Sequence, residues 1–176
     1  MNYADIKYCD VANGEGVRVS LFVSGCTHHC KECFNKEAWD FHYGNPFTQK
    51  EIDRILEYLK PNYIAGLSRL GGEPMEPVNQ EGILPLLRVV KQTYPEKNIW
   101  CYTGYLFDKD VLDKMCKESE VTKEIVSYLD IVVDGEFMID RKNLKINFRG
   151  SDNQRIIDVK KTLDAGEIVH WEREIQ

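Results

Sequence analysis

Apolar and polar positions along the chain alternate with two different periods, and these periods indicate where helices and strands form. The clearest helix is expected between a capping-box sequence at 48–51 (Thr-Gln-Lys-Glu) and Pro61. Inside this stretch the apolar residues recur at i, i+3, i+4 and i+7, the spacing of one helix face. They are Ile52, Ile55, Leu56 and Leu59.

Short apolar runs alternate with helical patterns over the rest of the chain. We expect strands at 17–23, 63–70, 98–102 and 129–133, and the last has the composition of a strand that is buried on both faces. Helices are expected at 79–93, with Pro85 near its first turns, and at 108–117, with Val111, Leu112 and Met115 facing inward. This alternation predicts an α/β fold with a mostly parallel sheet. Residues 155–176 fit either a strand plus a helix or a peripheral tail.

The length of the chain limits the architecture. Its 176 residues predict a single domain, 1–176, that is too short for an eightfold βα barrel of roughly 250 residues. A partial, incomplete barrel is therefore the expected form of the sheet.

Charge and hydropathy exclude two classes of partner. The formal net charge is −6 and no dense basic run occurs, so a nucleic-acid-binding surface is not expected. No stretch reaches the roughly 20 apolar residues of a membrane span, and the first residues lack the basic and apolar regions of a signal peptide. We therefore expect a cytoplasmic protein whose partners are proteins or small molecules.

Three of the six cysteines form a CxxxCxxC pattern directly after the strand expected at 17–23: Cys26, Cys30 and Cys33. In a reducing compartment such clustering favours metal binding over disulfides. Iron–sulfur clusters usually take four cysteine thiolates, so a set of three leaves one iron free to bind another group. The scattered Cys9, Cys101 and Cys116 are expected to be small buried hydrophobes.

Zinc is the alternative metal for these cysteines, because it also binds cysteine and histidine. The fourth ligand would then be His28, His29 or His42, since the chain has no second CxxC pair. His28 and His29 can equally shape the loop or contact a partner protein.

Polar groups follow the other expected strands. Ligands of parallel α/β sheets bind at the carboxyl ends of the strands, where the sequence places Gly71, Gly72, Glu73, Thr103 and Asp134. Glycines allow close backbone approach, and Glu73 can accept hydrogen bonds from an ammonium group. Thr103 and Asp134, and less directly Glu136, offer groups suited to a ribose or a carboxylate; ordinary turn chemistry is the alternative for all of them.

These motifs together resemble the activating enzymes of anaerobic ribonucleotide reductase, a family of the radical S-adenosylmethionine (SAM) superfamily. Many members of the superfamily carry an aromatic residue immediately before the third cysteine, whereas here Glu32 precedes it and Phe34 follows it. The resemblance covers most of the chain, in order: Gly14-Glu15-Gly16-Val17-Arg18, the three cysteines, Cys33-Phe34-Asn35, Leu70-Gly71-Gly72-Glu73-Pro74, Val133-Asp134-Gly135-Glu136-Phe137 and Arg149-Gly150-Ser151-Asp152-Asn153-Gln154.

The resemblance implies a partial radical-SAM βα barrel in which Cys26, Cys30 and Cys33 hold a 4Fe-4S cluster with one open iron. It implies SAM as the second cofactor, with the segment 71–73 binding its methionyl amino group. The residues expected to contact the cofactors are Glu32, Cys33, Phe34, Gly71, Gly72, Glu73, Thr103 and Asp134. For the segments 14–16 and 149–155 a solvated loop and a role at the cofactor or partner surface both remain open.

The implied activity is reductive cleavage of SAM to a 5′-deoxyadenosyl radical, which generates a glycyl radical on the large subunit of the anaerobic reductase. An electron donor such as flavodoxin is implied as well. Two alternatives remain: an activase of another glycyl radical enzyme, of the pyruvate formate-lyase type, and a non-catalytic zinc-binding interaction module.

Overall fold

A seven-stranded open sheet organises the chain. The computed structural model describes residues 1–173, and its strand order is β3-β1-β2-β4-β5-β6-β7. The four central strands are parallel, whereas β1, β3 and β7 pair antiparallel with their neighbours. The predicted α/β class is thus confirmed, and the sheet is mixed and does not close. The strands are β1 (Asn2–Asp10), β2 (Val17–Val23), β3 (Asn45–Pro46), β4 (Ile64–Gly71), β5 (Asn98–Thr103), β6 (Ile131–Asp134) and β7 (Arg155–Asp158).

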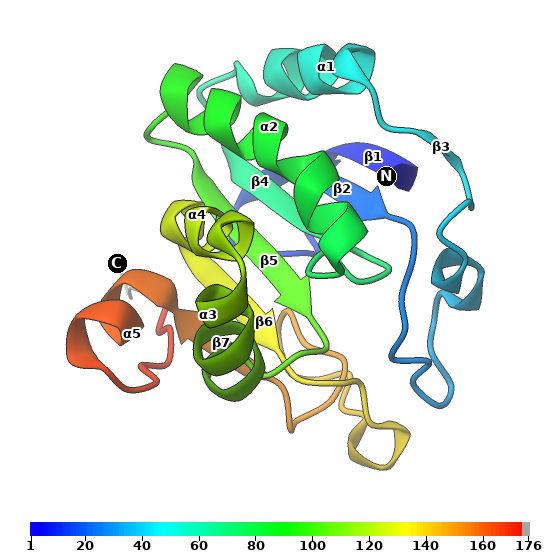
Figure 1. Cartoon of the computed structure of the whole chain (residues 1–176), viewed down its shortest axis with the longest axis vertical. Coiled ribbons are helices and arrows are strands. Elements are labelled where there is room, and N and C mark those ends of the chain that lie inside the picture. Colours follow the sequence, from blue (N-terminus) through cyan, green and yellow to red (C-terminus); the bar gives the residue numbers. More distant parts are fainter. Residues whose placement is uncertain (174–176) are drawn as a thin grey trace.

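Helices connect the parallel strands, and in Figure 1 α2 and α4 lie in front of β4, β5 and β6. A single helix was expected over 108–117, but the chain forms a π-helix, η2, followed by the short α3 and then α4. The backbone N–H of Val111 donates to the carbonyl of Leu106, five residues earlier, which is the wider spacing of a π-helix. The helices are α1 (Gln49–Leu59), α2 (Pro77–Thr93), η2 (Phe107–Met115), α3 (Cys116–Glu118), α4 (Glu120–Tyr128) and α5 (Val159–Ala165), with 3-10 turns η1 (Lys36–Trp39) and η3 (Ile139–Arg141).

The ends of α1 and α2 follow local rules. The backbone N–H of Thr48 donates to Glu51 at 2.7 Å, which confirms the capping box at the start of α1. Pro77 occupies the first position of α2, where a missing N–H costs nothing, and Pro85 lies inside this helix without ending it. After β7 comes α5, so residues 155–165 form a strand and a helix, as one of the two alternatives predicted, while 174–176 lie outside the described residues.

The two faces of the sheet have different packing partners because side chains alternate along each strand. Leu67, Ile99 and Val132 belong to the main core together with the apolar faces of the helices. On the opposite face Trp100 packs against Phe148 and Trp171 in a second cluster, with ring centroids 5.4 and 5.2 Å apart.

The strand β1 was not predicted, and it changes the environment of Cys9. The pairing of β1 with β2 is irregular between Lys7 and Asp10, and Cys9 has a left-handed backbone, with φ 60°. Such an irregularity redirects the side chain, so Cys9 is exposed and its prediction as a buried hydrophobe is wrong. Cys101 is buried as predicted, and Cys116 is only half-buried.

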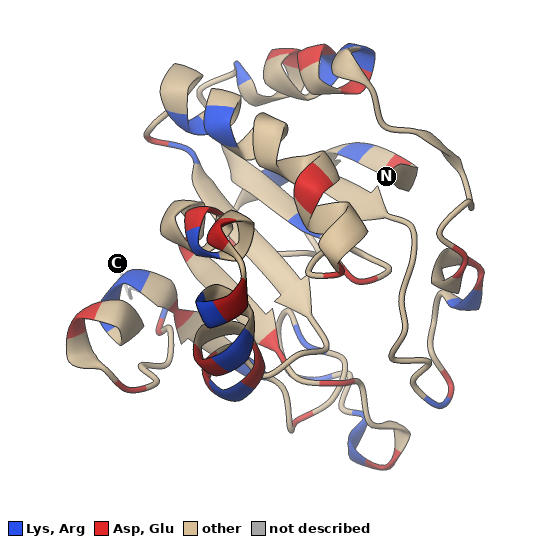
Figure 2. Cartoon of the chain, in the orientation of Figure 1, with Lys and Arg blue, Asp and Glu red and all other residues tan. Residues whose placement is uncertain are grey.

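The surface of the helices carries charges of both signs. Figure 2 shows Lys or Arg beside Asp or Glu on α1 and α4, the pattern of solvated helix faces. None of the helices within residues 1–173 has the length and apolarity needed to cross a membrane.

Removal of a core side chain from the central strands tests the packing. Leu67 on β4 is completely buried, so Leu67→Ala should lower the free energy of unfolding by about 2–5 kcal/mol in urea titrations. The control Leu144→Ala changes a side chain that is 83 % exposed and should alter it by less than about 0.5 kcal/mol. Equal effects of the two variants would contradict this packing.

Candidate functional site

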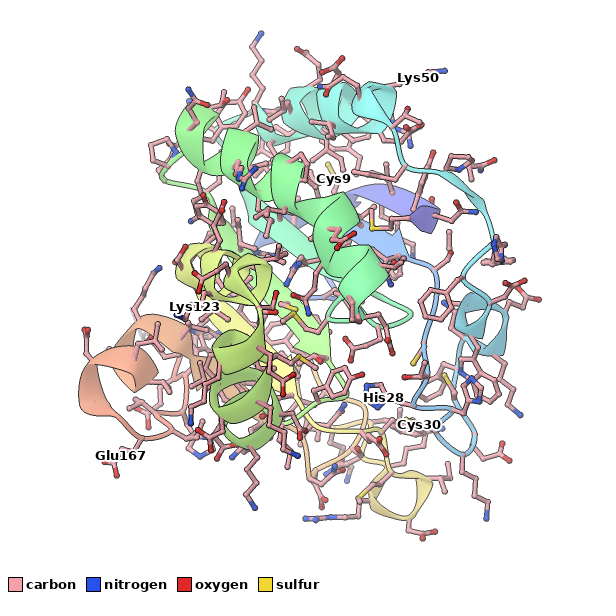
Figure 3. The ribbon with its side chains drawn as sticks, viewed as in Figure 1. Cys9, His28, Cys30, Lys50, Lys123 and Glu167 are labelled. Atoms are coloured by element: carbon pink, nitrogen blue, oxygen red, sulfur yellow. The ribbon has the colours of Figure 1, made fainter. Side chains whose placement is uncertain are left out.

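A cavity of about 400 Å³ lies at the carboxyl ends of the parallel strands. Its wall combines groups from segments that are far apart in the sequence, as expected for the carboxyl edge of a parallel sheet. Figure 3 shows His28 and Cys30 together at this end of the molecule, with Cys9 well away from them. The predicted residues that line the cavity are Cys26, Cys30, Cys33, Phe34, Gly71, Gly72, Glu73 and Thr103.

The cysteine loop is tied at its start to η1. Gly25 and Cys26 donate their backbone N–H groups to the carbonyls of Ala38 and Trp39, at 2.7 and 3.2 Å. Gly25 has φ +101°, and a Cβ there would lie only 2.2 Å from the Phe41 ring. This position therefore requires glycine, and it fixes where the first cysteine leaves β2.

Burial controls the ionisation of the cysteines. Desolvation raises the pKa of Cys26 to about 11, and it raises the pKa of Cys30 as well. Both groups are therefore thiols at neutral pH unless a metal replaces the proton, and metal binding at this loop must release protons.

The carboxylate of Glu73 is the most heavily bonded group in the cavity wall. Its Oε1 accepts from His28 Nε2 at 2.9 Å and from the hydroxyl of Thr103 and the N–H of Gly104, both at 2.7 Å. Its Oε2 accepts the N–H of Met75 at 2.8 Å. Since Glu73 is almost completely buried, these four donors compensate the cost of removing its charge from water.

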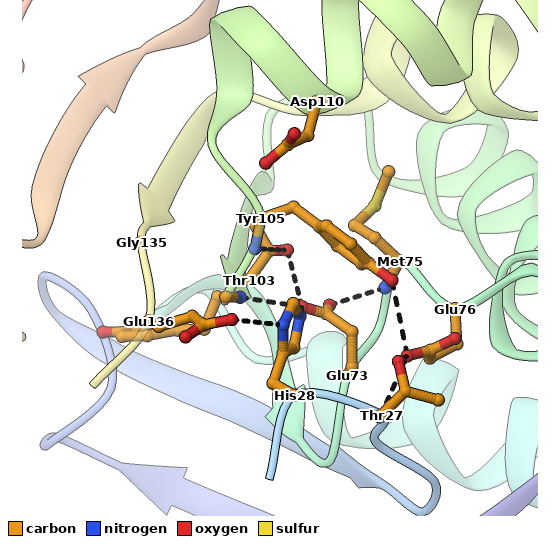
Figure 4. Close-up of polar contacts among 12 residues, drawn as sticks. Thr27, His28, Glu73, Met75, Glu76, Thr103, Tyr105, Asp110, Gly135 and Glu136 are labelled. Atoms are coloured by element: carbon orange, nitrogen blue, oxygen red, sulfur yellow. Dashed lines mark hydrogen bonds and ion pairs between the residues drawn. The ribbon is translucent and has the colours of Figure 1, made fainter. Parts of the chain in front are cut away.

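His28 joins the cysteine loop to two carboxylates, as Figure 4 shows. Nε2 bonds Glu73 and Nδ1 bonds Glu136, each at 2.9 Å, while the ring lies edge-on to Tyr105. Burial by itself would lower the pKa of His28, but the hydrogen bonds and charges of Glu73 and Glu136 outweigh it, so the pKa is raised. The imidazole thus links the ends of β4 and β6, and it can donate to both carboxylates when it is protonated.

Two residues at the start of α2 were not identified from the sequence. Glu76 accepts from both the N–H and the hydroxyl of Thr27, and the side-chain amide of Asn79 donates to the carbonyls of Ser24 and Glu73. Glu76 and Asn79 come three and six residues after Glu73, and this proximity to the glycine turn was the only feature of the sequence that could have indicated their role. They hold the cysteine loop against the glycine turn.

Asp134 lies outside the residues that line the cavity, although it too ends a parallel strand. Both of its carboxylate oxygens accept hydrogen bonds from Arg155, and one also accepts the N–H of Phe107. Arg155 reaches Asp108 as well. The carboxylate of Asp134 therefore joins β6 to β7 and η2.

Glu32 and Phe34 occupy different positions in the cysteine loop. Glu32 is exposed, is absent from the cavity wall and has φ 58°, so it forms the turn before Cys33. Phe34 lines the cavity while remaining 71 % exposed, and its ring lies 5.1 Å from that of Phe137.

The histidines considered as zinc ligands are separated in the structure. His28 is bonded to carboxylates through both ring nitrogens, His29 stacks on Trp39, and the side chain of His42 is 94 % exposed. Within residues 1–173, no three His, Cys, Asp or Glu side chains are grouped so that they could hold a metal ion.

Most of the chain is similar in sequence to known proteins. A family model described as a 4Fe-4S single cluster domain matches residues 12–157. Proteins named anaerobic ribonucleoside-triphosphate reductase-activating protein align with most of the chain. The one from Enterobacteria phage T4 is 42% identical (89% of this chain, 93% of that protein), and the one from Pasteurella multocida is 40% identical (89% and 96%). This chain belongs to that family of activating proteins. The relative from Escherichia coli K12 is 38% identical over 156 residues.

Removal of the histidine link should destabilise the cavity end of the sheet. His28→Ala deprives the buried carboxylate of Glu73 and the carboxylate of Glu136 of a donor, with an expected loss of about 1–3 kcal/mol in unfolding free energy. The control His42→Ala removes an exposed imidazole and should change it by less than about 0.5 kcal/mol. Urea unfolding of both variants in the same metal state measures the difference, and equal losses would contradict the link.

We expect the ion pair between Asp108 and Arg155 to contribute to the free energy of unfolding in a way that depends on pH. The hydrogen bond from Arg155 lowers the pKa of Asp108 below its ordinary 3.8. The contribution is thus present above about pH 4 and is lost as the pH falls through the lowered pKa. Asp108→Asn should be less stable than the wild type at neutral pH by at most about 1 kcal/mol, because the pair is partly exposed.

This difference should disappear in unfolding experiments carried out in acid. The control Asp164→Asn changes an exposed residue of α5 and should leave the pH profile of stability as it is in the wild type. A gap between Asp108→Asn and the wild type that stays constant from neutral pH into acid would refute the assignment.

Proposed function

We propose that the chain activates an anaerobic ribonucleotide reductase by generating a glycyl radical on its large subunit. The observation that carries the proposal is the shared cavity, in which three cysteines, one short of a closed cluster site, lie opposite the Gly71–Gly72 turn and Thr103. Its relatives, named as activating proteins of this reductase, supply the reaction.

The residue types of the cysteine loop fit a 4Fe-4S cluster rather than a single metal ion, for which no three side chains of residues 1–173 are grouped. Cys26, Cys30 and Cys33 are free and line one cavity, and three thiolates leave one iron for a further ligand. The backbone N–H of Asn35 donates to the sulfur of Cys33 at 3.5 Å, and hydrogen bonds to the sulfurs are one of the factors that set the potential of a cluster.

The cavity also fits SAM as the second cofactor. Its volume of about 400 Å³ falls within the range of roughly 300–1,000 Å³ that is usual for small-molecule sites. Because four donors already occupy the carboxylate of Glu73, we assign the ammonium of SAM to the backbone carbonyls of the turn at Gly71 and Gly72. In this assignment Glu73 and Thr103 hold the turn in place, and they do not bind the ammonium directly.

When bound, the cluster would supply one electron to the sulfonium of SAM, so that a carbon–sulfur bond breaks to give methionine and a 5′-deoxyadenosyl radical, which takes a hydrogen atom from glycine. The protein's part is to orient the reactants and exclude competing hydrogen donors. Trp39, Phe137 and Phe148 in the cavity wall serve this exclusion.

The open sheet explains how a protein can be the substrate. We interpret it as a partial radical-SAM barrel, since four parallel strands carry the site and the sheet ends at β3 and β7 without closing. An unclosed barrel leaves a lateral approach to the cavity for a loop of the reductase. A donor of the flavodoxin type would deliver the electron.

Loss of one cluster cysteine should abolish function. Cys30→Ala removes one of three ligands, so anaerobically prepared protein should lose its iron and sulfide and should release no 5′-deoxyadenosine in the presence of the reductase. The control Cys9→Ala changes an exposed cysteine outside the cavity and should retain both. Full activity of Cys30→Ala would refute the assignment.

The identity of the protein substrate has its own test. Co-expression with the anaerobic reductase should give a glycyl radical signal in electron paramagnetic resonance, and co-expression with pyruvate formate-lyase should not. A signal on the lyase alone would replace the proposed substrate with the other class of glycyl radical enzyme.

A further inference from the structure

Three residues that line the cavity each carry a buried polar atom without a hydrogen-bond partner among the described residues. These atoms are Nε1 of Trp39, Oη of Tyr102 and Nε of Arg149. All three can donate a hydrogen bond, and two of them can do nothing else. The main acceptor in the wall, the carboxylate of Glu73, already accepts four hydrogen bonds, three at Oε1 and one at Oε2. The cavity is therefore complementary to a ligand that brings acceptors.

Arg149 adds an uncompensated positive charge to this wall. Its Nη1 donates to the carbonyl of Gln154 at 3.2 Å, and it forms no ion pair with a carboxylate of residues 1–173. The other basic group of the wall, the imidazole of His28, is engaged by Glu73 and Glu136 through both ring nitrogens. Two other arginines, Arg141 and Arg155, do pair with carboxylates.

The backbone around Arg149 is held in place before any ligand binds. The N–H groups of Gly150 and Ser151 both donate to the side-chain oxygen of Gln154, at 2.8 and 3.2 Å. Phe148, with φ 62°, is anchored between Trp100 and Trp171. A fixed guanidinium fork is suited to a carboxylate, which it can bind through two parallel hydrogen bonds.

We propose that Arg149 binds the carboxylate of SAM and so positions the methionyl end of the ligand in the cavity. The inference rests on the proposed function, because it takes SAM as the ligand. SAM carries a single anionic group, and its ammonium and sulfonium are cations that a guanidinium repels. The carboxylate is therefore the group that Arg149 selects, and Trp39 and Tyr102 remain for the neutral acceptors of the ligand.

Equilibrium dialysis of cluster-loaded protein with SAM, in the absence of oxygen, tests the contact. Arg149→Gln should weaken SAM binding by about ten- to a hundredfold, and Arg149→Lys, which keeps the charge without the fork, should fall between this variant and the wild type. The control Arg141→Gln removes an exposed arginine that pairs with Asp152. This variant should bind SAM with the affinity of the wild type.

A ligand that lacks the carboxylate separates a direct contact from a general defect of the cavity. Wild type and Arg149→Gln should bind decarboxylated SAM equally, because the interaction that the variant removes is then absent from both. Iron content and melting temperature report whether the variant is folded and loaded. Should Arg149→Gln lose the cluster, the same comparison is made with Arg149→Lys.

Two results would overturn the inference. The first is undiminished SAM affinity of the variants; if activation of the reductase is weakened at the same time, Arg149 belongs to the partner interface instead. The second is the same loss of affinity for SAM and for decarboxylated SAM. Failure of the wild type itself to bind SAM would instead overturn the proposed function, on which the inference rests.

Discussion

The buried carboxylate of Glu73 is the interaction on which the geometry of the site depends. A negative charge that is withdrawn from water must receive hydrogen bonds from the protein or destabilise the fold. Glu73 receives them from the cysteine loop through His28, from the end of β5 through Thr103 and Gly104, and from the start of α2 through Met75. Each of these segments is therefore held at a fixed distance from the glycine turn, and the cavity between them has a defined shape.

His28 extends this constraint to a fourth segment and to the cysteines that we propose as metal ligands. It lies between Cys26 and Cys30 in the sequence, and its second nitrogen reaches Glu136 beyond the end of β6. Two carboxylates that follow separate strands, β4 and β6, thus help to hold the cysteine loop in position. A loop of this kind keeps its place because of charge and hydrogen bonding, even where burial leaves the thiols protonated.

Local patterns in the sequence predicted the parts of the fold that depend on near neighbours. The capping box at Thr48 and the helical spacing of Ile52 to Leu59 concern one turn and one face, so α1 was found within a residue of its bounds. The strand β1 was missed because it is stabilised by pairing with β2 and β3, which the sequence does not display. The π-helix η2 was expected as an ordinary helix, because residues such as Val111 face inward in either form.

The same distinction applies to the site. The cysteine spacing and the glycine turn are local signals, and the structure places both in one cavity. The bonding of Asp134 to Arg155 joins residues that are 21 positions apart, and that of His28 to Glu73 joins residues 45 positions apart. Such pairs depend on the tertiary fold. The sequence alone therefore could not show that the carboxylate of Asp134, at the end of a strand, is bonded to an arginine.

The second core, on the face of the sheet away from the helices, has a role in the site beyond stability. Trp100 packs there against Phe148, Trp171 and the buried Arg18, whose guanidinium lies over the Trp100 ring and donates to Ser68. A left-handed phenylalanine is a strained conformation that persists only when its surroundings fix it. Because this cluster fixes Phe148, the next residue, Arg149, enters the cavity from a rigid position. The aromatic packing of the sheet thereby determines where the free positive charge of the site lies.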